Sequence, residues 1–446
     1  MTAHHPPGQA TPGSPPVKMR RVAFASFIGT VVEFYDFGIY ATAAALVFAK
    51  VFFPALGTNA GTAVAFATLG VAFVARPVGA ILFGHFGDRL GRKNTLIATM
   101  SLMGAATVLI GLLPTAASIG VIAPILLVVL RVAQGLAAGG EWAGAALFTS
   151  EHAPKDRRGF WATFTNLGGA VANILSLGTF LMVALFMSDD TFLAWGWRIP
   201  FLISIVLIAV GLWVRLKIEE TPAFTAEAKR HHTGPLPFKE AFSKQYREIL
   251  LGAGSLIMAF SLGYIGIAYL TNYGTATLGL TRPEVLVAGI FGNLVNGLCI
   301  VSGGILSDRF GRRRVLLTVN ALAVPWSLVL FPLLDTKSLA AFYLGMIVSF
   351  ILAGHGFGVA GSFLSELFHT RYRYTAAGLA YSLAGVLGGA IPPLVAATVI
   401  GTYGGFVFGI MLSAYCLVGL LCTVALRETR DRDLVEDDFQ AEAKIA

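Results

Sequence analysis

The chain has 446 residues, of which 56% are hydrophobic and only 13% are charged, and its mean hydropathy is +0.75. Soluble domains average about 25% charged residues, so this composition excludes a water-soluble globular protein and predicts a surface that faces lipid. The formal net charge of +8 does not call for nucleic acid, because the basic residues gather in particular loops.

Twelve apolar stretches follow one another along the chain, each long enough for a bilayer core that needs roughly 20 apolar residues per helix. Residues 1–17 form a polar tail, which we expect to be disordered and cytoplasmic, and 18–215 hold the first six stretches. A charged linker spans 216–246, six more stretches occupy 247–427, and a short acidic tail covers 428–446. We therefore predict an all-α membrane protein with twelve transmembrane helices in two six-helix bundles.

A charged loop occurs twice, with its two aspartates 220 residues apart. Residues 84–93 read GHFGDRLGRK, and residues 304–313 read GILSDRFGRR. This duplication at about half the chain length indicates two pseudo-symmetric halves, an arrangement typical of secondary transporters. A glutamate opens another charged loop at matching places of the two halves. The acids do not serve the positive-inside rule, so we expect ion pairs that gate access at one end. The candidate gating residues are Asp88, Arg89, Arg92, Glu151, Asp308, Arg309, Arg312 and Glu366.

The distribution of basic residues predicts an orientation. Of the 32 Lys and Arg residues, 26 lie before the first stretch, in every second loop, or after the last stretch. By the positive-inside rule, both termini are expected in the cytoplasm of a multi-pass protein of the inner (plasma) membrane.

The first half places acids inside the membrane, where burying charge is expensive and an ionisable residue is a functional candidate by default. Glu33, Asp36 and Tyr40 have the spacing i, i+3, i+7, which puts them on one face of the first helix. Glu141 lies in the fourth stretch. Because a buried carboxyl can be neutral at ordinary pH, we take Glu33, Asp36 and Glu141 as candidates for proton coupling.

Two arginines lie among these acids, Arg76 in the second stretch and Arg131 in the fourth. Arginine stays charged in proteins, and its planar fork suits a carboxylate. If two acids neutralise the two arginines, the third can take up a proton. If an arginine instead meets a substrate anion, proton uptake and anion binding share one charge balance. The competing interpretation is a set of structural ion pairs, with Glu141 near enough to the cytoplasm to extend its carboxylate toward water.

The second half offers mostly neutral polar groups and aromatic faces, which suit a substrate pocket. Arg198 of the first half is expected at its outer mouth. The candidate substrate-binding residues are Tyr40, Arg76, Arg131, Gln134, Asn166, Arg198, Tyr264, Tyr269, Asn272 and Tyr381.

No nucleotide-binding loop, zinc-binding motif or nucleophile elbow occurs, so we expect no enzyme activity and no cofactor. The three cysteines lie in apolar stretches without metal-ligand spacing, so no metal site is expected. Transport would then use an ion or substrate gradient, with a small organic acid, protons and lipid as partners of a monomer. Two alternatives stay open: a proton-coupled exporter of metabolites or drugs, and a sensor that binds a ligand without moving it. Membrane-centre arginines argue against the first, and the short tails against the second.

The repeated DR-x-GR-K/R loop resembles the signature of the major facilitator superfamily. Further stretches resemble its metabolite:proton symporters: EFYDF at 33–37, RVAQG with GGEW at 131–142, WGWRIPF at 195–201 and ETPAF at 220–224. ATAAALVF at 41–48 and PILLV at 124–128 look similar to the shikimate-transporter-like branch.

The resemblance implies the major facilitator fold and import of shikimate, oxoglutarate, citrate or related acids with protons, by alternating access. Some members import zwitterionic osmolytes and carry a long coiled-coil tail, for which residues 428–446 are too short. Two departures from the family pattern are Phe34, where many members have Trp, and His369, where many have Pro.

Overall fold

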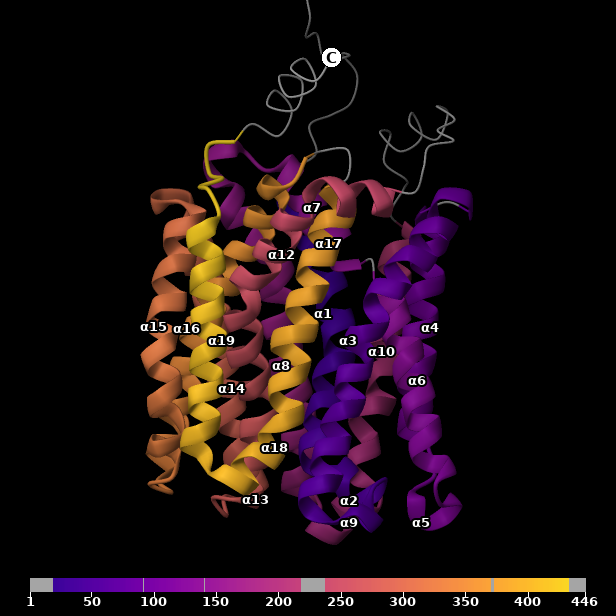
Figure 1. Ribbon diagram of the computed structural model, residues 1–446. Coiled ribbons are helices and arrows are strands. Elements are labelled where there is room, and N and C mark those ends of the chain that lie inside the picture. The colour runs from indigo at the N-terminus through magenta and orange to yellow at the C-terminus, as the bar shows by residue number, and fades with distance from the viewer. Residues whose placement is uncertain (1–18, 91, 140, 218–236, 370–372, 433–446) are drawn as a thin grey trace, which may run out of the picture.

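The computed structural model in Figure 1 describes residues 19–90, 92–139, 141–217, 237–369 and 373–432. Side chains are described for all of these except residues 58, 84–90, 92–96, 214–217 and 237–241. The tail 1–17, most of the linker and residues 433–446 lie outside the described residues. Within the described ranges the secondary structure is helical, with no strand, as predicted.

In the first half the helices are α1 (Met19–Ala43), α2 (Ala49–Val51), α3 (Gly57–Leu90), α4 (Arg92–Leu112), α5 (Ala116–Ile119), α6 (Ile122–Ala138), α7 (Glu141–His152), α8 (Arg158–Phe186), α9 (Asp189–Ala194) and α10 (Ile199–Lys217). In the second half they are α12 (Pro237–Tyr264), α13 (Leu270–Ala276), α14 (Arg282–Phe310), α15 (Arg312–Leu334), α16 (Leu339–Leu367), α17 (Arg373–Ala384), α18 (Ile391–Tyr403) and α19 (Gly405–Ala425).

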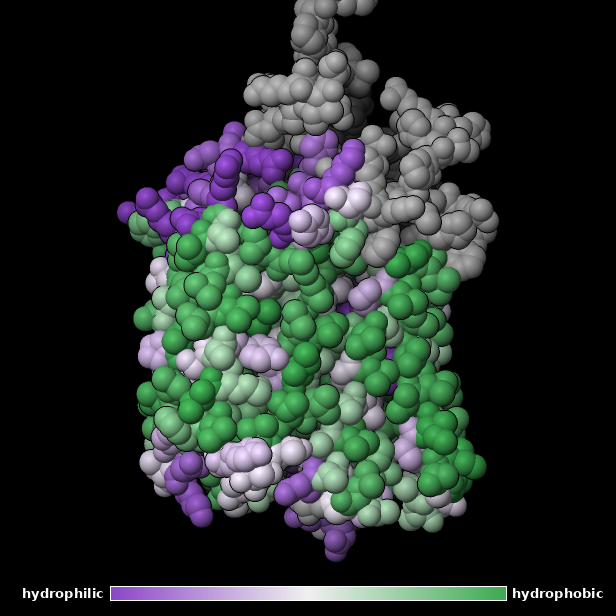
Figure 2. All heavy atoms as spheres, viewed as in Figure 1, coloured by the Kyte–Doolittle hydropathy of each residue, from purple (hydrophilic) through white to green (hydrophobic). Residues whose placement is uncertain are grey.

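Eleven helical spans among the described residues are long and apolar enough to cross a membrane, and the shorter apolar helix Ile97–Leu112 within α4 supplies the twelfth stretch. Apolar chains in lipid must satisfy their backbone internally, which is why these stretches form helices. Figure 2 shows the resulting apolar band, with a hydrophilic layer most extensive at the end where α10 leaves the first half and α12 begins the second. The chain is a multi-pass membrane protein. We call this hydrophilic end the linker end.

The two halves lie side by side, with α4, α6 and α10 on one flank and α15, α16 and α19 on the other (Figure 1). They meet where α14 packs against α8 and α18 packs against α3. The sequence repeat extends to local geometry, because five-residue π-helices interrupt the first helix of each half at Ala44–Phe48 and Ile265–Tyr269. Their starts are 221 residues apart, almost the offset of the charged loops. Such π-helical turns are frequent at functional sites.

Helical structure is present before residue 247, where the second half is predicted to start. Helix α12 starts at Pro237, inside the predicted linker, and Gln245 breaks its helical geometry with φ −130° and ψ 30°. The predicted boundary therefore falls two residues beyond this kink.

Helices α3 and α6 cross at very short range because glycine stands at the contact. A Cβ atom on Gly79 would collide with the backbone of Leu136, and one on Gly135 with the backbone of Ala72. Small residues permit this close approach of helices in lipid. The crossing brings together the two helices that carry Arg76 and Arg131.

Candidate functional site

Arg76 and Arg131 lie against the same aromatic ring. The Cζ atoms of Arg76 and Arg131 are 4.1 and 4.6 Å from the centre of the Phe37 ring, and Arg131 is also 3.8 Å from that of Tyr40. The arginines are only 4% and 0% exposed. Aromatic faces attract cations, so the rings of α1 stabilise two positive charges that would otherwise repel each other.

Arg131 reaches Asp36 through two intermediate side chains. Its Nη1 donates to Oε1 of Gln134 at 3.0 Å, and Nε2 of Gln134 donates to Oγ1 of Thr107 at 2.7 Å. Thr107 then donates to Oδ2 of Asp36 at 2.8 Å. The four side chains come from α6, α4 and α1 and are all buried. In the described part of the chain no direct ion pair joins Asp36 to an arginine, so Asp36 is linked to Arg131 only through these hydrogen bonds.

Several polar atoms at this site have no hydrogen-bond partner among the described residues. They are Nε and Nη2 of Arg76, Nε and Nη2 of Arg131, and Oδ1 of Asp36. Nε and Nη2 form one edge of a guanidinium group, the edge that takes both oxygens of a carboxylate. Leaving such donors unpaired in a buried place costs free energy, which an anion at this position would recover.

A small cavity of about 40 Å³ lies between the halves beside this site. Phe37 is shared by both, since its ring contacts the two arginines and also lines the cavity. The other aromatic lining residues are Phe34, Phe260, Tyr264, Phe357 and Tyr381, and the amides are Asn166, Asn173 and Asn296. A buried water needs about 10–15 Å³ measured this way, so the cavity holds a few waters and must widen for a metabolite.

Asn166 ties the halves together at the cavity wall. Its Oδ1 accepts from Nε1 of Trp142 at 3.0 Å and from the hydroxyl of Tyr381 at 3.4 Å. Its Nδ2 donates to the carbonyl oxygen of Phe357 at 2.7 Å. The rings of Trp142 and Tyr381 also stack, with centroids 3.4 Å apart.

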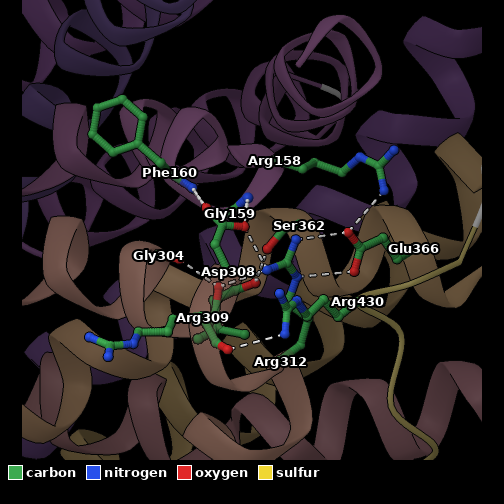
Figure 3. Close-up of polar contacts among 12 residues, drawn as sticks. Arg158, Gly159, Phe160, Gly304, Asp308, Arg309, Arg312, Ser362, Glu366 and Arg430 are labelled. Atoms are coloured by element: carbon green, nitrogen blue, oxygen red, sulfur yellow. Dashed lines mark hydrogen bonds and ion pairs between the residues drawn. The ribbon is translucent and has the colours of Figure 1, made fainter. Parts of the chain in front are cut away.

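At the linker end Asp308 caps a helix of the opposite half (Figure 3). Its carboxylate accepts from the backbone N–H groups of Gly159 and Phe160, both at 2.8 Å, at the start of α8. Arg312 donates to Asp308 at 2.7 Å. An acid at a helix N-terminus satisfies unpaired N–H groups and favours the helix dipole, so this contact joins the halves directly.

Glu366 lies at the centre of the same cluster and is fully buried. It accepts from Arg312 at 3.1 and 3.2 Å, and from Arg158 of the first half at 3.1 Å. Thr429, beyond the last helix, adds a fourth bond at 2.9 Å. A second bridge between the halves joins Arg373 to Glu151 at 3.3 Å. We call Arg158, Asp308, Arg312 and Glu366 the linker-end cluster.

Further contacts join the halves at the opposite end. Nδ2 of Asn272 donates to the carbonyl oxygen of Ala45, inside the first π-helix, at 2.8 Å. Arg282 at the start of α14 pairs with Asp189 at the start of α9. Both ends are therefore bridged around the cavity.

Several predicted site residues converge and others do not. Glu33 is 1% exposed and interacts electrostatically with Asp36, while Glu141 is partly buried at the start of α7. Seven predicted residues lie at the site around Arg76 and Arg131 or line the cavity: Tyr40, Arg76, Arg131, Gln134, Asn166, Tyr264 and Tyr381.

Three predicted site residues, Arg198, Tyr269 and Asn272, make their contacts away from the cavity. The guanidinium of Arg198 donates to the carbonyl oxygens of Ala194 and Leu113, and Arg198 does not line the cavity. Tyr269 packs against other aromatic rings near the opposite end, where Asn272 also lies.

Among the predicted gating residues, Arg309 points away from the linker-end cluster and lies over the Phe310 ring (Figure 3). The side chains of Asp88, Arg89 and Arg92 lie outside the described residues. Thr107, Arg158 and Thr429 are site residues that the sequence did not single out.

Comparisons with known proteins agree with this architecture. A family model described as Major Facilitator Superfamily matches residues 26–393. The inner membrane metabolite transport protein YhjE of Escherichia coli (strain K12) is 40% identical over 425 residues, covering 94% of this chain and 97% of that protein. The shikimate transporter of the same strain is 39% identical over 420 residues, covering 93% and 95%. A proline/betaine transporter of Salmonella typhimurium is 31% identical over 433 residues, covering 94% and 85%. A crystal structure of a D-xylose-proton symporter shares the fold, with a TM-score of 0.73 at 17% identity over 94% of this chain and 100% of that chain.

Proposed function

We propose that this chain imports a small organic acid together with protons by alternating access, on the premise that it belongs to the major facilitator superfamily. Membership follows from the family match over most of the chain and from relatives at 37–40% identity. The chain is accordingly a transporter of small molecules and not an enzyme. The substrate, the proton coupling and the orientation are parts of the proposal.

The unpaired edges of Arg76 and Arg131, together with the hydrogen bonds that link Arg131 to Asp36, carry the proposal. Two buried cations with free bidentate edges favour an anion over a neutral or cationic ligand. A buried carboxyl that is linked to one of them by hydrogen bonds provides a place for a proton. When the acid is protonated, the local charge becomes more positive and the anion binds better. The two cargoes therefore favour each other's binding, as symport requires.

The ring of aromatic side chains and amides around the cavity supports a small polar metabolite as the cargo. Phe34, Phe260 and Tyr264 offer flat faces to a carbon ring, and Asn173 and Asn296 offer hydrogen bonds to hydroxyl groups. Together with the 39% identical shikimate transporter, these features favour shikimate or a similar carboxylic acid. A di- or tricarboxylate would engage both arginines.

Residues of both halves bridge each end of the protein, which supports alternating access. The cavity is too small for such an acid, so one set of bridges must open for it to enter. We place the linker end in the cytoplasm, because 26 of the 32 basic residues are assigned to that side of the inner membrane. The linker-end cluster is then the inner gate, and the Asn272 and Arg282 contacts are parts of the outer one.

Uptake into proteoliposomes under an imposed pH gradient tests the proposal. Shikimate, 2-oxoglutarate, citrate and glycine betaine would each be offered, with the lumen alkaline or at the external pH. We expect one of the acids to accumulate only with the gradient. Accumulation that ignores the gradient would remove the proton coupling. Accumulation of glycine betaine alone would instead favour an osmolyte importer, as in the 31% identical relatives.

Arg131→Leu should weaken the binding of the transported acid by about 100-fold, because a bidentate bond to a charged group contributes about 3 kcal/mol. Arg131→Lys keeps the charge but loses the fork, so it should restore only part of the affinity. Affinity would be measured by ligand-induced thermal stabilisation of purified protein. Arg198→Leu is the matched control, because Arg198 bonds to backbone carbonyl oxygens away from the cavity. Equal losses in both leucine variants would reject Arg131 as the anion site.

A further inference from the structure

We propose that Thr107 and Gln134 form a relay that carries the protonation state of Asp36 to Arg131. The inference rests on the proposed function and deepens it, because it names the residues that join the proton site to the anion site. Neither residue needs to touch the substrate, so both act as positioning residues.

The chemistry of the four groups fixes the direction of every bond in the relay. A guanidinium group only donates, so the Gln134 amide must turn its oxygen toward Arg131, at 3.0 Å. Its nitrogen then faces Thr107 at 2.7 Å and donates to the hydroxyl oxygen. The hydroxyl of Thr107 is left with one hydrogen and one free lone pair.

That single hydrogen has two acceptors within reach. Oδ2 of Asp36 is 2.8 Å from the Thr107 oxygen, and the backbone oxygen of Met103 is 2.9 Å from it. One hydrogen cannot serve both in a normal bond. When Asp36 is charged, the bond to its carboxylate is the stronger one, because charge-assisted hydrogen bonds are about twice as strong as neutral ones.

When Asp36 takes up a proton on Oδ2, the bond reverses. The new Asp36 O–H donates to the Thr107 oxygen, and the Thr107 hydrogen turns to the Met103 oxygen. The Thr107 oxygen then accepts two bonds, from Asp36 and from Gln134, which its two lone pairs allow. One proton is added, Thr107 keeps its own hydrogen, and no other covalent bond changes. The two acceptors beside Thr107 thus give each state of Asp36 a satisfied partner.

The two states hold Arg131 differently. A charged Asp36 polarises Thr107 and Gln134, since hydrogen bonds in a chain strengthen one another, and its negative charge compensates the nearby guanidinium. Protonation removes both effects and leaves the Nε and Nη2 edge of Arg131 to an external anion. Glu33 and Tyr35 on α1 interact electrostatically with Asp36. Around Arg131 the charged or titratable groups include Tyr40 of α1 and Arg76 of α3, which lies across the Phe37 ring.

Infrared spectroscopy of the protein in lipid, titrated with pH, tests the first link. The protonated Asp36 should give a carboxylic C=O band that is missing in Asp36→Asn. Thr107→Val removes the donor to the charged carboxylate, so the titration midpoint of Asp36 should rise by about one pH unit. It also removes the acceptor of the O–H group of protonated Asp36, so the band should shift to higher frequency. Thr107→Ser keeps the hydroxyl and should behave like the unaltered protein. If valine and serine give the same band and midpoint, or if no band is lost in Asp36→Asn, the inference is overturned.

A double-mutant cycle tests the second link. Gln134→Met has a similar length but no polar atoms, and Gln134→Asn keeps the amide but is too short to span both partners. Each should raise the Asp36 midpoint less than Thr107→Val does. In a serial relay, changing Gln134 no longer raises the Asp36 midpoint when Thr107 is already valine. If the Gln134 change raises the midpoint equally with threonine and with valine at position 107, Arg131 interacts with Asp36 directly through space, and the relay would be wrong.

These measurements need neither a ligand nor transport, so their failure is distinguishable from failure of the proposed function. Melting temperatures of all variants identify any that are unfolded. If a valine or methionine variant is unfolded, Thr107→Ser and Gln134→Asn are compared with the unaltered protein instead. A chain that shows the serial effect but accumulates no acid under a pH gradient would keep the relay and lose the symport. The opposite pair of results would keep the symport and remove the relay.

Discussion

Asp36→Asn should abolish accumulation of the transported acid while exchange of internal for external acid continues. Asparagine has the size of the protonated acid and can still bond to Thr107, but it cannot bind or release a proton. A gradient of about one pH unit supports about tenfold accumulation of an acid carried with one proton, because 1.36 kcal/mol corresponds to a factor of ten. We expect this ratio to fall to about one in the variant. Uptake of labelled acid into proteoliposomes, with and without internal acid, measures both activities.

The matched control is Asp156→Asn, the same chemical change at an exposed carboxylate between α7 and α8. It should accumulate the acid as well as the unaltered protein does. Full accumulation by Asp36→Asn would reject Asp36 as the proton site. In that case Glu33, which is equally buried one turn away, becomes the group to replace.

Glu366→Gln should destabilise the protein by about 3–5 kcal/mol and open the linker end. Glu366 compensates two buried cations, Arg158 and Arg312, and removing one partner of a buried charged network leaves the others uncompensated. The bonds from Arg312 lie within the second half, whereas the bond from Arg158 of the first half forms only while the halves are together at that end. The loss of the Arg158 bond therefore falls on the closed form, and the population shifts toward the open one.

Spin labels at exposed positions 155 and 314 would report the separation of the halves at the linker end, and labels at 190 and 337 the separation at the opposite end. We expect the first distance to lengthen in Glu366→Gln. Glu284→Gln is the matched control, since Glu284 caps the start of α14 outside the linker-end cluster, so this change should cost much less stability. An unchanged distance together with a small loss of stability would contradict a gating role for Glu366.

The fold was largely predictable from the sequence because lipid imposes one rule on every stretch. Apolar runs of sufficient length must be helical, and the repeated charged loop revealed the two halves. The bound of α12 at Pro237 carries no apolar signal, because this residue lies in a charged segment before the apolar stretch.

The charged part of the site was also predictable, because an ionisable residue in a membrane helix is rare enough to be noticed. Thr107 was not, since a threonine in an apolar helix commonly bonds to its own backbone, as Thr107 also does to Met103. Its second acceptor, Asp36, depends on how α4 packs against α1. Only three-dimensional coordinates contain that relation.

Arg198 and Thr429 both have hydrogen-bond partners that the sequence pattern does not reveal. Arg198 was predicted as a ligand because it is a cation at the membrane edge, and in the structure two of its nitrogens donate to backbone carbonyl oxygens. Thr429 follows the last helix, where no periodic pattern marks it, yet its hydroxyl bonds to the buried carboxylate of Glu366. Sequence pattern predicts which residue types are costly to bury, whereas the partner that offsets the cost is set by packing.

Counting the protons that accompany ligand binding tests the shared charge balance of Asp36 and Arg131 most directly. The ligand would be whichever of shikimate, 2-oxoglutarate and citrate most stabilises the purified protein, and calorimetry in buffers of different ionisation enthalpy would give the count. Above the infrared midpoint of Asp36 we expect about one proton to be taken up per acid bound, by linkage, and none in Asp36→Asn. Binding without proton uptake, or uptake that persists in Asp36→Asn, would show that anion and proton are not coupled at this site.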